Sequence, residues 1–513
     1  MSTVEAVSPR AVRARSIVKD LPGERLRELA RSGEQTTEYG SPVYSTRVKN
    51  RSAKNTYIVE DGVEVGVMQQ AMDPERAQEK IRQVQEALAG MDLLQVDRRM
   101  GDTPEATLRC RLYVPKEYAR IAFMWHNMLF PSDSSFAPDF VSVYVPDWPE
   151  RLIFCDVEQG YTYILGTDYP GEAKKSMLRQ AMYWIKRRGG LGLHAGSKIL
   201  RVKGPDGTLR DVGFLLFGLS GTGKTTLTLH DHGLQEPERA IIKQDDVVLM
   251  TSQGSAYGTE DGFYIKTEGL EPSQAVLWGA ATHPTATYEN IKVNDSGKVD
   301  FLDTSLTSNG RGVVLRRFIK GTGDGIDLPK ANKIVFITRR NDVVPVCARL
   351  TSEQAAAYFM LGESIETSAG DPTRAGQAKR EVGTNPFIVG PEAQEGNRLL
   401  EILRENPDME AYILNTGSVG AGDGFPGEKV TIKVSTEIMK QIAKEGITWE
   451  KDPDWGYDVP VAVPGLDLEK YTPGRYYSAD KYEDLVGKLR RERVDWLAQF
   501  PGLEPAIPAA VER

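Results

Sequence analysis

The residues from Gly218 to Thr226 have the types and spacing of a loop that binds phosphate. They are Gly218, Leu219, Ser220, Gly221, Thr222, Gly223, Lys224, Thr225 and Thr226. An apolar run (214–217) precedes them, and a stretch that favours a helix follows. Glycines allow the backbone to wrap around an oligophosphate with its N–H groups pointing inward. Lys224 would reach the β- and γ-phosphates, and the Thr225 hydroxyl would hold Mg²⁺; the alternative is a chance glycine-rich turn.

Two adjacent carboxylates, Asp245 and Asp246, interrupt the apolar segment 239–250, which we expect to be a strand. Carboxylates inside a strand are costly to bury unless they hold a metal or act as a base. Because they come after a phosphate-binding loop, they are candidates for the acidic residue that completes the coordination of Mg²⁺ there. The alternative is an edge strand with solvated acids.

Three other groups of residues could take part in chemistry. Lys174 and Lys175 fall in the first turn of an expected helix (173–186), where cations are electrostatically unfavourable. They are either a solvated surface pair or part of a substrate or metal pocket that keeps one lysine neutral. His194, on an apolar stretch, is either a core residue or a ligand. Basic residues 47, 49, 51 and 54 form a turn that is either solvated or in contact with an anionic substrate.

A mixed α/β framework must position these residues. Apolar periodicity predicts helices at 21–31, 74–91, 115–129, 173–186, 352–361, 395–405, 436–444 and 479–497. Alternating residues predict strands at 56–59, 108–113, 141–145, 152–155, 161–165, 262–266, 276–278, 288–293, 298–302, 333–338 and 411–414.

The composition excludes several classes of protein. A chain of 513 residues with 40% hydrophobic and 27% charged residues is typical of a globular protein with more than one domain. Its net charge of −8 argues against nucleic acid or an anionic membrane as the main partner. Three distant cysteines without a CxxC pattern favour the reducing cytoplasm. No apolar run reaches the ~18 residues of a membrane span, and the sequence predicts no oligomeric state.

Several motifs, in chain order, resemble those of ATP-dependent phosphoenolpyruvate carboxykinases. In this chain, GLSGTGKTTLT (218–228) resembles the family's phosphate-binding loop, and NRSAKNTYIV (50–59) resembles its arginine loop. YPGEAKKSM (169–177) resembles its motif of a tyrosine and paired lysines. The match continues with GLGLHAGS (190–197), QDD (244–246), FYIKTEGLEP (263–272), NGR (309–311) and the segments at Arg349 and Asn415. Several motifs in the same order are more specific than any one of them.

The resemblance implies two mixed α/β lobes with the active site in the cleft. Residues 1–190 would form the substrate-binding lobe, and residues 191–513 the nucleotide- and metal-binding lobe, which contains the phosphate-binding loop. Lys175 as a neutral amine, His194 and Asp246 would ligate Mn²⁺. Thr225 would hold the Mg²⁺ that accompanies ATP, and Asp245 is a further candidate metal ligand.

The resemblance also implies roles for other side chains. Arg51 and Tyr169 would bind the dicarboxylate substrate, while Lys174 and Arg311 would stabilise charge between the enolate and the γ-phosphate. The remaining nucleotide-side positions are Lys266, Glu271, Lys429 and Ser435.

The implied reaction converts oxaloacetate and ATP to phosphoenolpyruvate, CO₂ and ADP. Decarboxylation creates the nucleophilic enolate, so no general base is needed. A small-molecule or protein kinase on the same fold would also use Lys224 and Thr225, with Asp245 or Asp246 as base. A kinase would not require Arg51, Tyr169, Lys175 and His194. A non-catalytic nucleotide-binding sensor is a third hypothesis.

The sequence departs from the family pattern near the expected site. Val247 and Val248 follow where Glu-His is usual. The segment after the histidine usually carries Cys-Ser-Ala-Asn and here reads Ala195-Gly196-Ser197. The arginine loop has Asn50 and Ala53 in place of glycine and proline. The segment between Thr226 and Asp245 is longer than usual. GTP-dependent relatives have a cysteine-containing phosphate-binding loop, which favours ATP for this chain. We therefore expect a divergent member with the same reaction.

Overall fold

The computed structural model describes residues 8–132, 137–219, 221–366, 377–422 and 424–512. The expected mixed α/β fold is confirmed. The chain forms two compact units, of which the first comprises Met1–Trp184, Thr259–Lys320 and Phe387–Gly390. The second comprises Ile185–Gly258, Gly321–Pro386 and Pro391–Arg513. These units differ from a single division after residue 190, because Thr259–Lys320 belongs to the first unit.

A nine-stranded mixed sheet of order β1-β6-β7-β9-β11-β10-β4-β5, with β8 paired to β6, forms the core of the first unit. Its strands are β1 (Ser16–Lys19), β4 (Thr56–Val59), β5 (Ala71–Met72), β6 (Asp92–Met100), β7 (Leu108–Pro115), β8 (Phe130–Pro131), β9 (Phe140–Val145), β10 (Leu152–Asp156) and β11 (Tyr161–Leu165). Helix α2 (Pro74–Leu88) packs Ile81 and Val84 against one face, together with Val143 of β9. Helix α4 (Gly171–Lys186) lies on the other face, where Ser176 Oγ is 2.8 Å from Ser142 Oγ.

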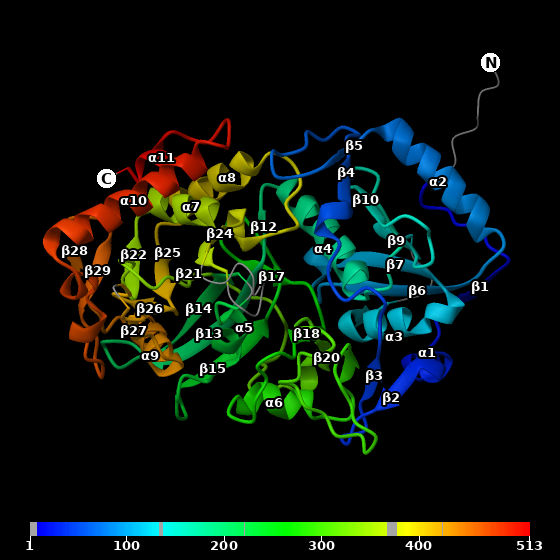
Figure 1. The fold of residues 1–513 in the computed structure, drawn as a ribbon, viewed down its shortest axis with the longest axis horizontal. Helices are drawn as coiled ribbons and strands as arrows, with labels where there is room; N and C mark the ends of the chain where they lie inside the picture. The colour runs from blue at the N-terminus through cyan, green and yellow to red at the C-terminus, as the bar shows by residue number, and fades with distance from the viewer. Residues whose placement is uncertain (1–7, 133–136, 220, 367–376, 423, 513) are drawn as a thin grey trace. The chain divides into compact units, whose positions relative to one another are not determined.

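A second sheet in the first unit joins two distant parts of the sequence. Its order is β18-β20-β19-β3-β2. Its strands are β2 (Glu34–Thr36), β3 (Pro42–Tyr44), β18 (Gly262–Lys266), β19 (Thr287–Glu289) and β20 (Arg311–Leu315). Helices α1 (Gly23–Ala30), α3 (Ala119–Met128) and α6 (Ala275–Ala281) complete the unit. Figure 1 shows β2 and β3 in blue and β18 and β20 in green.

Two of the expected strands in this region are wrong. Residues 276–278 lie in α6, because the apolar run AVLWGAA is too short for its periodicity to distinguish a strand from a helix. Residues 298–302 form no strand; Val299 makes one isolated bridge with Val293.

An eight-stranded sheet of order β15-β13-β14-β21-β25-β22-β29-β28 forms the core of the second unit. Its strands are β13 (Ala195–Lys203), β14 (Leu209–Gly218), β15 (Arg239–Gln244), β21 (Lys333–Thr338), β22 (Cys347–Leu350), β25 (Glu410–Asn415), β28 (Thr448–Lys451) and β29 (Asp458–Ala462). Strand β14 pairs in parallel with β21, and β21 with β25. The carboxyl ends of these three strands therefore share one edge of the sheet.

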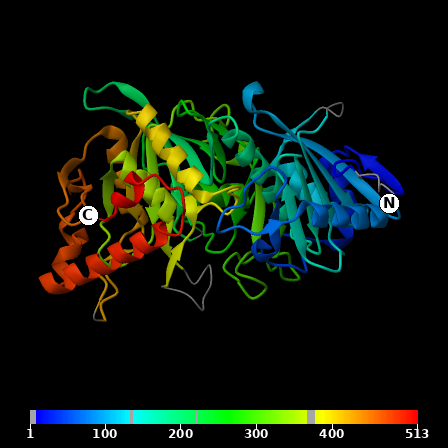
Figure 2. The same ribbon diagram turned by 90° about the horizontal axis from the view of Figure 1, so that it is seen from above.

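Helices cover both faces of this sheet (Figure 1). They are α5 (Lys224–Leu229), α7 (Ser352–Leu361), α8 (Glu392–Glu405), α9 (Ile432–Lys444), α10 (Ala479–Leu497) and α11 (Ala506–Ala509). Leu227 of α5 and Ile438 of α9 share a core with Leu216 of β14. The next residue, Phe217, faces the opposite side and packs edge-on against Phe359 of α7. Helices α8, α10 and α11 contact α7, and Figure 2 shows the yellow and red helices from above.

The aspartate pair lies where the chain passes between two sheets. Strand β15 ends at Gln244, and β16 (Val248–Met250) begins a separate sheet with β12 (Leu191–Leu193) and β17 (Ala256–Gly258). The expectation of one continuous strand (239–250) was wrong, because Asp245 and Asp246 occupy this connection. The short hairpins are β23 (Glu363–Ile365) with β24 (Ala378–Arg380), and β26 (Ser418–Val419) with β27 (Glu428–Lys429). Across the described ranges, every helix is too short or too polar for a membrane crossing.

Candidate active site

The phosphate-binding loop connects β14 to α5 with the backbone that its glycines allow. Gly221 and Gly223 have φ angles of 85° and 98°, which L side chains rarely adopt. A Cβ on Gly218 would lie 2.4 Å from Thr222 Oγ1, so this position also requires glycine. Ser220 lies outside the described residues.

Two residues at the same edge of the sheet support this loop. Arg339, directly after β21, donates from Nη1 to Gly221 O at 2.8 Å. Thr416, directly after β25, donates from Oγ1 to Thr222 O at 2.7 Å. Neither residue was predicted, although the carboxyl ends of parallel strands are where such contacts are expected.

A histidine and a carboxylate meet at the lysine of the loop. His194 Nε2 lies 3.0 Å from Asp246 Oδ1, and Lys224 Nζ lies 3.2 Å and 3.3 Å from these two atoms. His194 Nδ1 lies 2.5 Å from Thr384 O, and because a carbonyl can only accept, Nδ1 carries the proton. Nε2 therefore faces Lys224 and Asp246. The alternative of a purely core histidine does not explain this arrangement.

The second aspartate is close to the threonine of the loop. Thr225 Oγ1 donates to Asp245 Oδ2 at 3.2 Å. The hydroxyl and the carboxylate are the pair of oxygens expected to hold Mg²⁺ beside a nucleotide.

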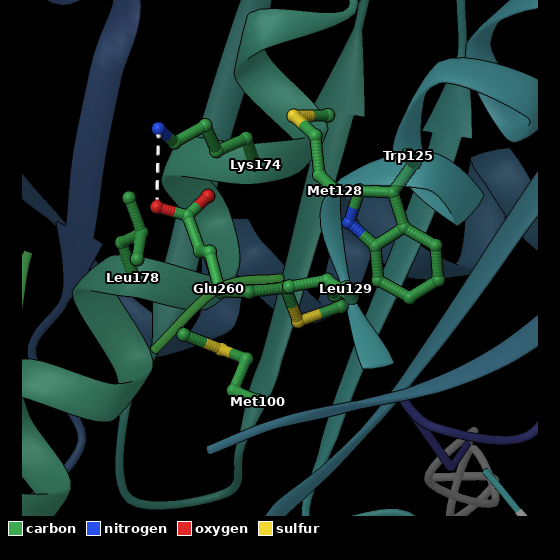
Figure 3. A pocket seen from close by; sticks show the side chains of 8 residues that line it. Met100, Trp125, Met128, Leu129, Lys174, Leu178 and Glu260 are labelled. Atoms are coloured by element: carbon green, nitrogen blue, oxygen red, sulfur yellow. Dashed lines mark ion pairs between the residues drawn. The ribbon is translucent and has the colours of Figure 1, made fainter. Parts of the chain in front are cut away.

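In the first unit, Lys174 is buried and ion-paired. Its Nζ lies 3.2 Å from Glu260 Oε2, and the two side chains are 3% and 2% exposed. Figure 3 shows the pair beside an apolar pocket lined by Met100, Trp125, Met128, Leu129, Met177 and Leu178. This burial argues against a solvated surface role for Lys174.

Lys175, in the first turns of α4, contacts Tyr169 and Glu172. Its Nζ lies 4.7 Å from the centre of the Tyr169 ring and 3.6 Å from Glu172 Oε1. Glycine at 171 is required here, because a Cβ would lie 2.6 Å from the Tyr169 ring. The structure therefore brings the predicted Tyr169 and Lys175 together.

Tyr264 lies near two of the predicted cations. Lys174 Nζ is 5.3 Å and Arg311 Cζ is 5.5 Å from the centre of its ring. Its hydroxyl donates to the buried carboxylate of Glu289. Burial raises the pKa of Glu289 to about 7 and the pKa of Tyr264 well above its usual value. Sequence reasoning missed Glu260, Tyr264 and Glu289, because each depends on contacts with distant parts of the chain.

The arginine loop is anchored to the start of α4. Ser52 N donates to Glu172 Oε1 at 2.7 Å, beside the exposed Arg51. Asn309 donates from Nδ2 to Lys49 O and accepts from Arg311 Nη2, both at 2.8 Å. These bonds bring the Arg51 loop close to the segments that carry Lys175 and Arg311.

The four remaining nucleotide-side predictions lie in different settings. Lys266 is the Cα partner of Arg311 between β18 and β20 and forms an ion pair with Glu268. Glu271 is exposed before α6, and Lys429 is exposed on β27. Ser435 is 1% exposed within α9. Their contacts with a nucleotide stay predictions.

The glycine-rich loop at the carboxyl ends of three parallel strands in a mixed sheet, with its lysine, threonine and aspartates, defines a P-loop α/β protein. A model of the phosphoenolpyruvate carboxykinase family matches residues 15–469. The chain therefore belongs to the ATP-dependent phosphoenolpyruvate carboxykinase family.

Similar proteins include three that are named phosphoenolpyruvate carboxykinase (ATP). The protein from Aeropyrum pernix is 38% identical over 412 residues, which cover 80% of this chain and 81% of the relative. The protein from Geobacillus thermodenitrificans is 29% identical over 93% of this chain and 92% of its own length. The protein from Sinorhizobium medicae is 28% identical over 94% and 91%.

Proposed function

We propose that the chain converts oxaloacetate and ATP to phosphoenolpyruvate, CO₂ and ADP. The observation that carries this proposal is the position of Lys224 Nζ, within 3.3 Å of both His194 Nε2 and Asp246 Oδ1. A P-loop kinase needs the lysine and a Mg²⁺ site, but it has no need for an imidazole there. The names of the relatives support the same reaction.

The donor atoms fit the two metal ions that the family implies. The imidazole nitrogen of His194 and the carboxylate of Asp246 suit Mn²⁺. Lys175 as a further ligand stays a prediction from the resemblance. Thr225 and Asp245 offer oxygen atoms, which suit Mg²⁺. When bound, the ions supply Lewis-acid stabilisation of negative charge.

The residues of the first unit would act on oxaloacetate. Arg51 and Tyr169 would hold its carboxylates. The bond between the β-carboxylate carbon and its neighbour breaks, CO₂ leaves, and the electron pair remains in the enolate. Lys174 and Arg311 would stabilise this charge, so the enolate forms without a general base.

The residues of the second unit would act on ATP. The enolate oxygen attacks the γ-phosphorus, and the bond from that phosphorus to the β-phosphate oxygen breaks, releasing ADP. Lys224 and the backbone N–H groups of the loop would neutralise the charge spread over the phosphate oxygens.

The location of the protein in the cytoplasm stays a prediction from its cysteine usage.

The test is an assay of phosphoenolpyruvate formation with Mn²⁺, Mg²⁺, ATP and oxaloacetate. We expect Lys175→Ala to lower kcat by at least about 100-fold, as for loss of a charge-stabilising group. Lys80→Ala, which removes a surface lysine paired with Glu150, is the matched control and should retain activity. Consumption of ATP only with a hydroxyl acceptor would favour a kinase instead, and ATP binding without turnover would favour a sensor.

A further inference from the structure

One face of β13 packs along helix α5, which begins at the phosphate-binding loop. Gly196 and Lys198 lie two residues apart on this strand, so both point to the same side, and His194 directly precedes the strand. His194 meets Lys224 in the first turn of α5. The other two residues contact later parts of the same helix.

Gly196 allows the last turn of α5 to lie close to the strand. A Cβ at this position would lie 2.2 Å from Thr228 Oγ1. Thr228 is fully buried, and its hydroxyl donates to Lys224 O at 2.9 Å. Thr228 therefore contacts both Gly196 of the strand and the backbone carbonyl of the P-loop lysine.

Lys198 binds the end of α5 with its ammonium group. Lys198 Nζ lies 3.0 Å from Leu227 O, 2.5 Å from His230 O and 3.0 Å from His232 Nε2. His232 Nδ1 lies 3.0 Å from Thr436 O of α9, so Nδ1 carries the proton and Nε2 accepts. An ammonium group has three N–H donors for these three acceptors, whereas a neutral amine would direct its lone pair at one of them.

Placing a lysine here has an energetic cost. Lys198 is 0% exposed, and burial lowers its pKa to about 7, while the charge of Asp231 opposes that shift. His232 is 4% exposed and has a φ of 58°, an unusual value for a residue with a Cβ. A methionine would fill the same space without burying a charge, so the hydrogen bonds account for the choice of lysine.

We propose that Lys198 is a positioning residue that fixes α5 against β13 and thereby holds Lys224 and Thr225 in place for the phosphates of ATP. It acts from the opposite end of the helix, through the carbonyls of Leu227 and His230 and through His232. This inference rests on the proposed function only for its kinetic readout.

The first test measures ATP affinity by calorimetry with Mg²⁺ and without oxaloacetate. Lys198→Met is expected to weaken ATP binding by at least about tenfold, as for the loss of hydrogen bonds from a charged group. Lys203→Met, at an exposed lysine on the same strand, is the matched control and should bind ATP like the wild type. A folded Lys198→Met variant with wild-type ATP affinity would overturn the proposal.

Steady-state kinetics separate positioning from a general loss of folded protein. Positioning predicts a raised KM for ATP and an unchanged KM for oxaloacetate. A purely structural role predicts that kcat falls with the folded fraction while both KM values stay constant, which would contradict the proposal. Wild-type protein that binds ATP but forms no phosphoenolpyruvate would refute the carboxykinase reaction and leave the calorimetric test valid.

A second variant decides the question if Lys198→Met does not fold. His232→Leu removes one acceptor and leaves the lysine in place, so it should also weaken ATP binding. Wild-type ATP affinity in this variant would overturn the proposal. If both single variants fold, the double variant should lose less ATP affinity than the sum of the single losses, because the two side chains share one hydrogen bond.

Discussion

His194 Nε2 lies 3.0 Å from Asp246 Oδ1, and the carbonyl of Thr384 fixes the proton of this histidine on Nδ1. Nε2 of this imidazole and the carboxylate of Asp246 therefore face the same point, where Lys224 Nζ also lies. A cation bound by His194 and Asp246 would take over the electrostatic role of the lysine there. Lys224 would then be available for the phosphates of ATP.

Removing the imidazole should separate Mn²⁺ binding from ATP binding. We expect His194→Ala to weaken Mn²⁺ binding by at least about tenfold, because one of the predicted ligands is lost. ATP affinity with Mg²⁺ alone should change little. Free Mn²⁺, measured by electron paramagnetic resonance during titration, checks this. His283→Ala is the control, since His283 stacks on Phe318 and is not one of the predicted ligands. An equal loss in both variants would argue against a metal role.

The hydroxyl of Thr225 should determine the Mg²⁺ requirement. Thr225→Val keeps the shape of the side chain but removes the oxygen that lies 3.2 Å from Asp245 Oδ2. We expect the Mg²⁺ concentration for half-maximal activity to rise by about tenfold or more. A Mg²⁺ titration at saturating ATP provides the measurement. An unchanged Mg²⁺ dependence would exclude Thr225 as a ligand.

The buried carboxyl of Glu289 should make stability depend on pH. Burial raises its pKa from 4.5 to about 7, so the folded protein retains this proton where the unfolded chain has lost it. The stabilising contribution is therefore fully present below pH 4.5 and is lost as the pH rises through about 7. Its total size is on the order of 3 kcal/mol.

Glu289→Gln should remove this pH dependence, because glutamine does not titrate. Urea unfolding at several pH values should show that the free energy of unfolding falls less steeply with pH in this variant than in the wild type. Glu64→Gln, at an exposed glutamate, is the control and should follow the wild type. Parallel pH curves for wild type and Glu289→Gln would contradict the prediction.

Arg493 of α10 forms a buried ion pair that should contribute strongly to stability. Its Nη2 and Nε bind Glu363 at 2.8 Å and 3.2 Å, and its Cζ lies within 4.9 Å of the ring centres of Tyr358 and Trp455. Arg493→Met should lower the free energy of unfolding by about 1.5–3 kcal/mol, the usual cost of losing hydrogen bonds to a charged group. Glu363 keeps its second arginine partner, Arg380, at 2.8 Å.

A surface arginine provides the comparison for this prediction. Arg404 pairs with Glu353 and Glu504 but keeps 45% of its side chain exposed. Arg404→Met should cost less than about 1 kcal/mol. Denaturant unfolding of both variants gives the two changes in the free energy of unfolding. Equal changes would show that the buried ion pair stabilises the protein no more than the surface pair does.

The parts of the fold that follow local signals were predictable from the sequence. Helix α7 begins after a capping box between Thr351 and Gln354 and ends at Gly362, which has a left-handed backbone. Helix α10 begins after Ser478, whose side chain accepts from Lys481 N. Both helices have the predicted bounds. Helix α6 was mistaken for a strand, since its short apolar run lacks such signals.

The candidate site was predictable where one motif contains its own chemistry, or where the resemblance to a family named the residues. The P-loop lies as expected between β14 and α5, because strand, glycines, lysine and helix are contiguous. The ion pair between Lys174 and Glu260 joins residues far apart in the sequence, so no local pattern indicates it. The segment after Thr226 supplies His230 and His232 as partners of Lys198, and no local sequence pattern indicates this contact.

The most direct test of the proposed reaction is its stoichiometry. Purified protein with Mn²⁺, Mg²⁺, ATP and oxaloacetate should release CO₂ and form phosphoenolpyruvate and ADP in equal amounts, followed together by ³¹P nuclear magnetic resonance and trapping of labelled CO₂. Lys224→Ala should abolish phosphoenolpyruvate formation. ATP hydrolysis without phosphoenolpyruvate, or transfer of the γ-phosphate to a hydroxyl acceptor in place of the enolate, would contradict the proposed function.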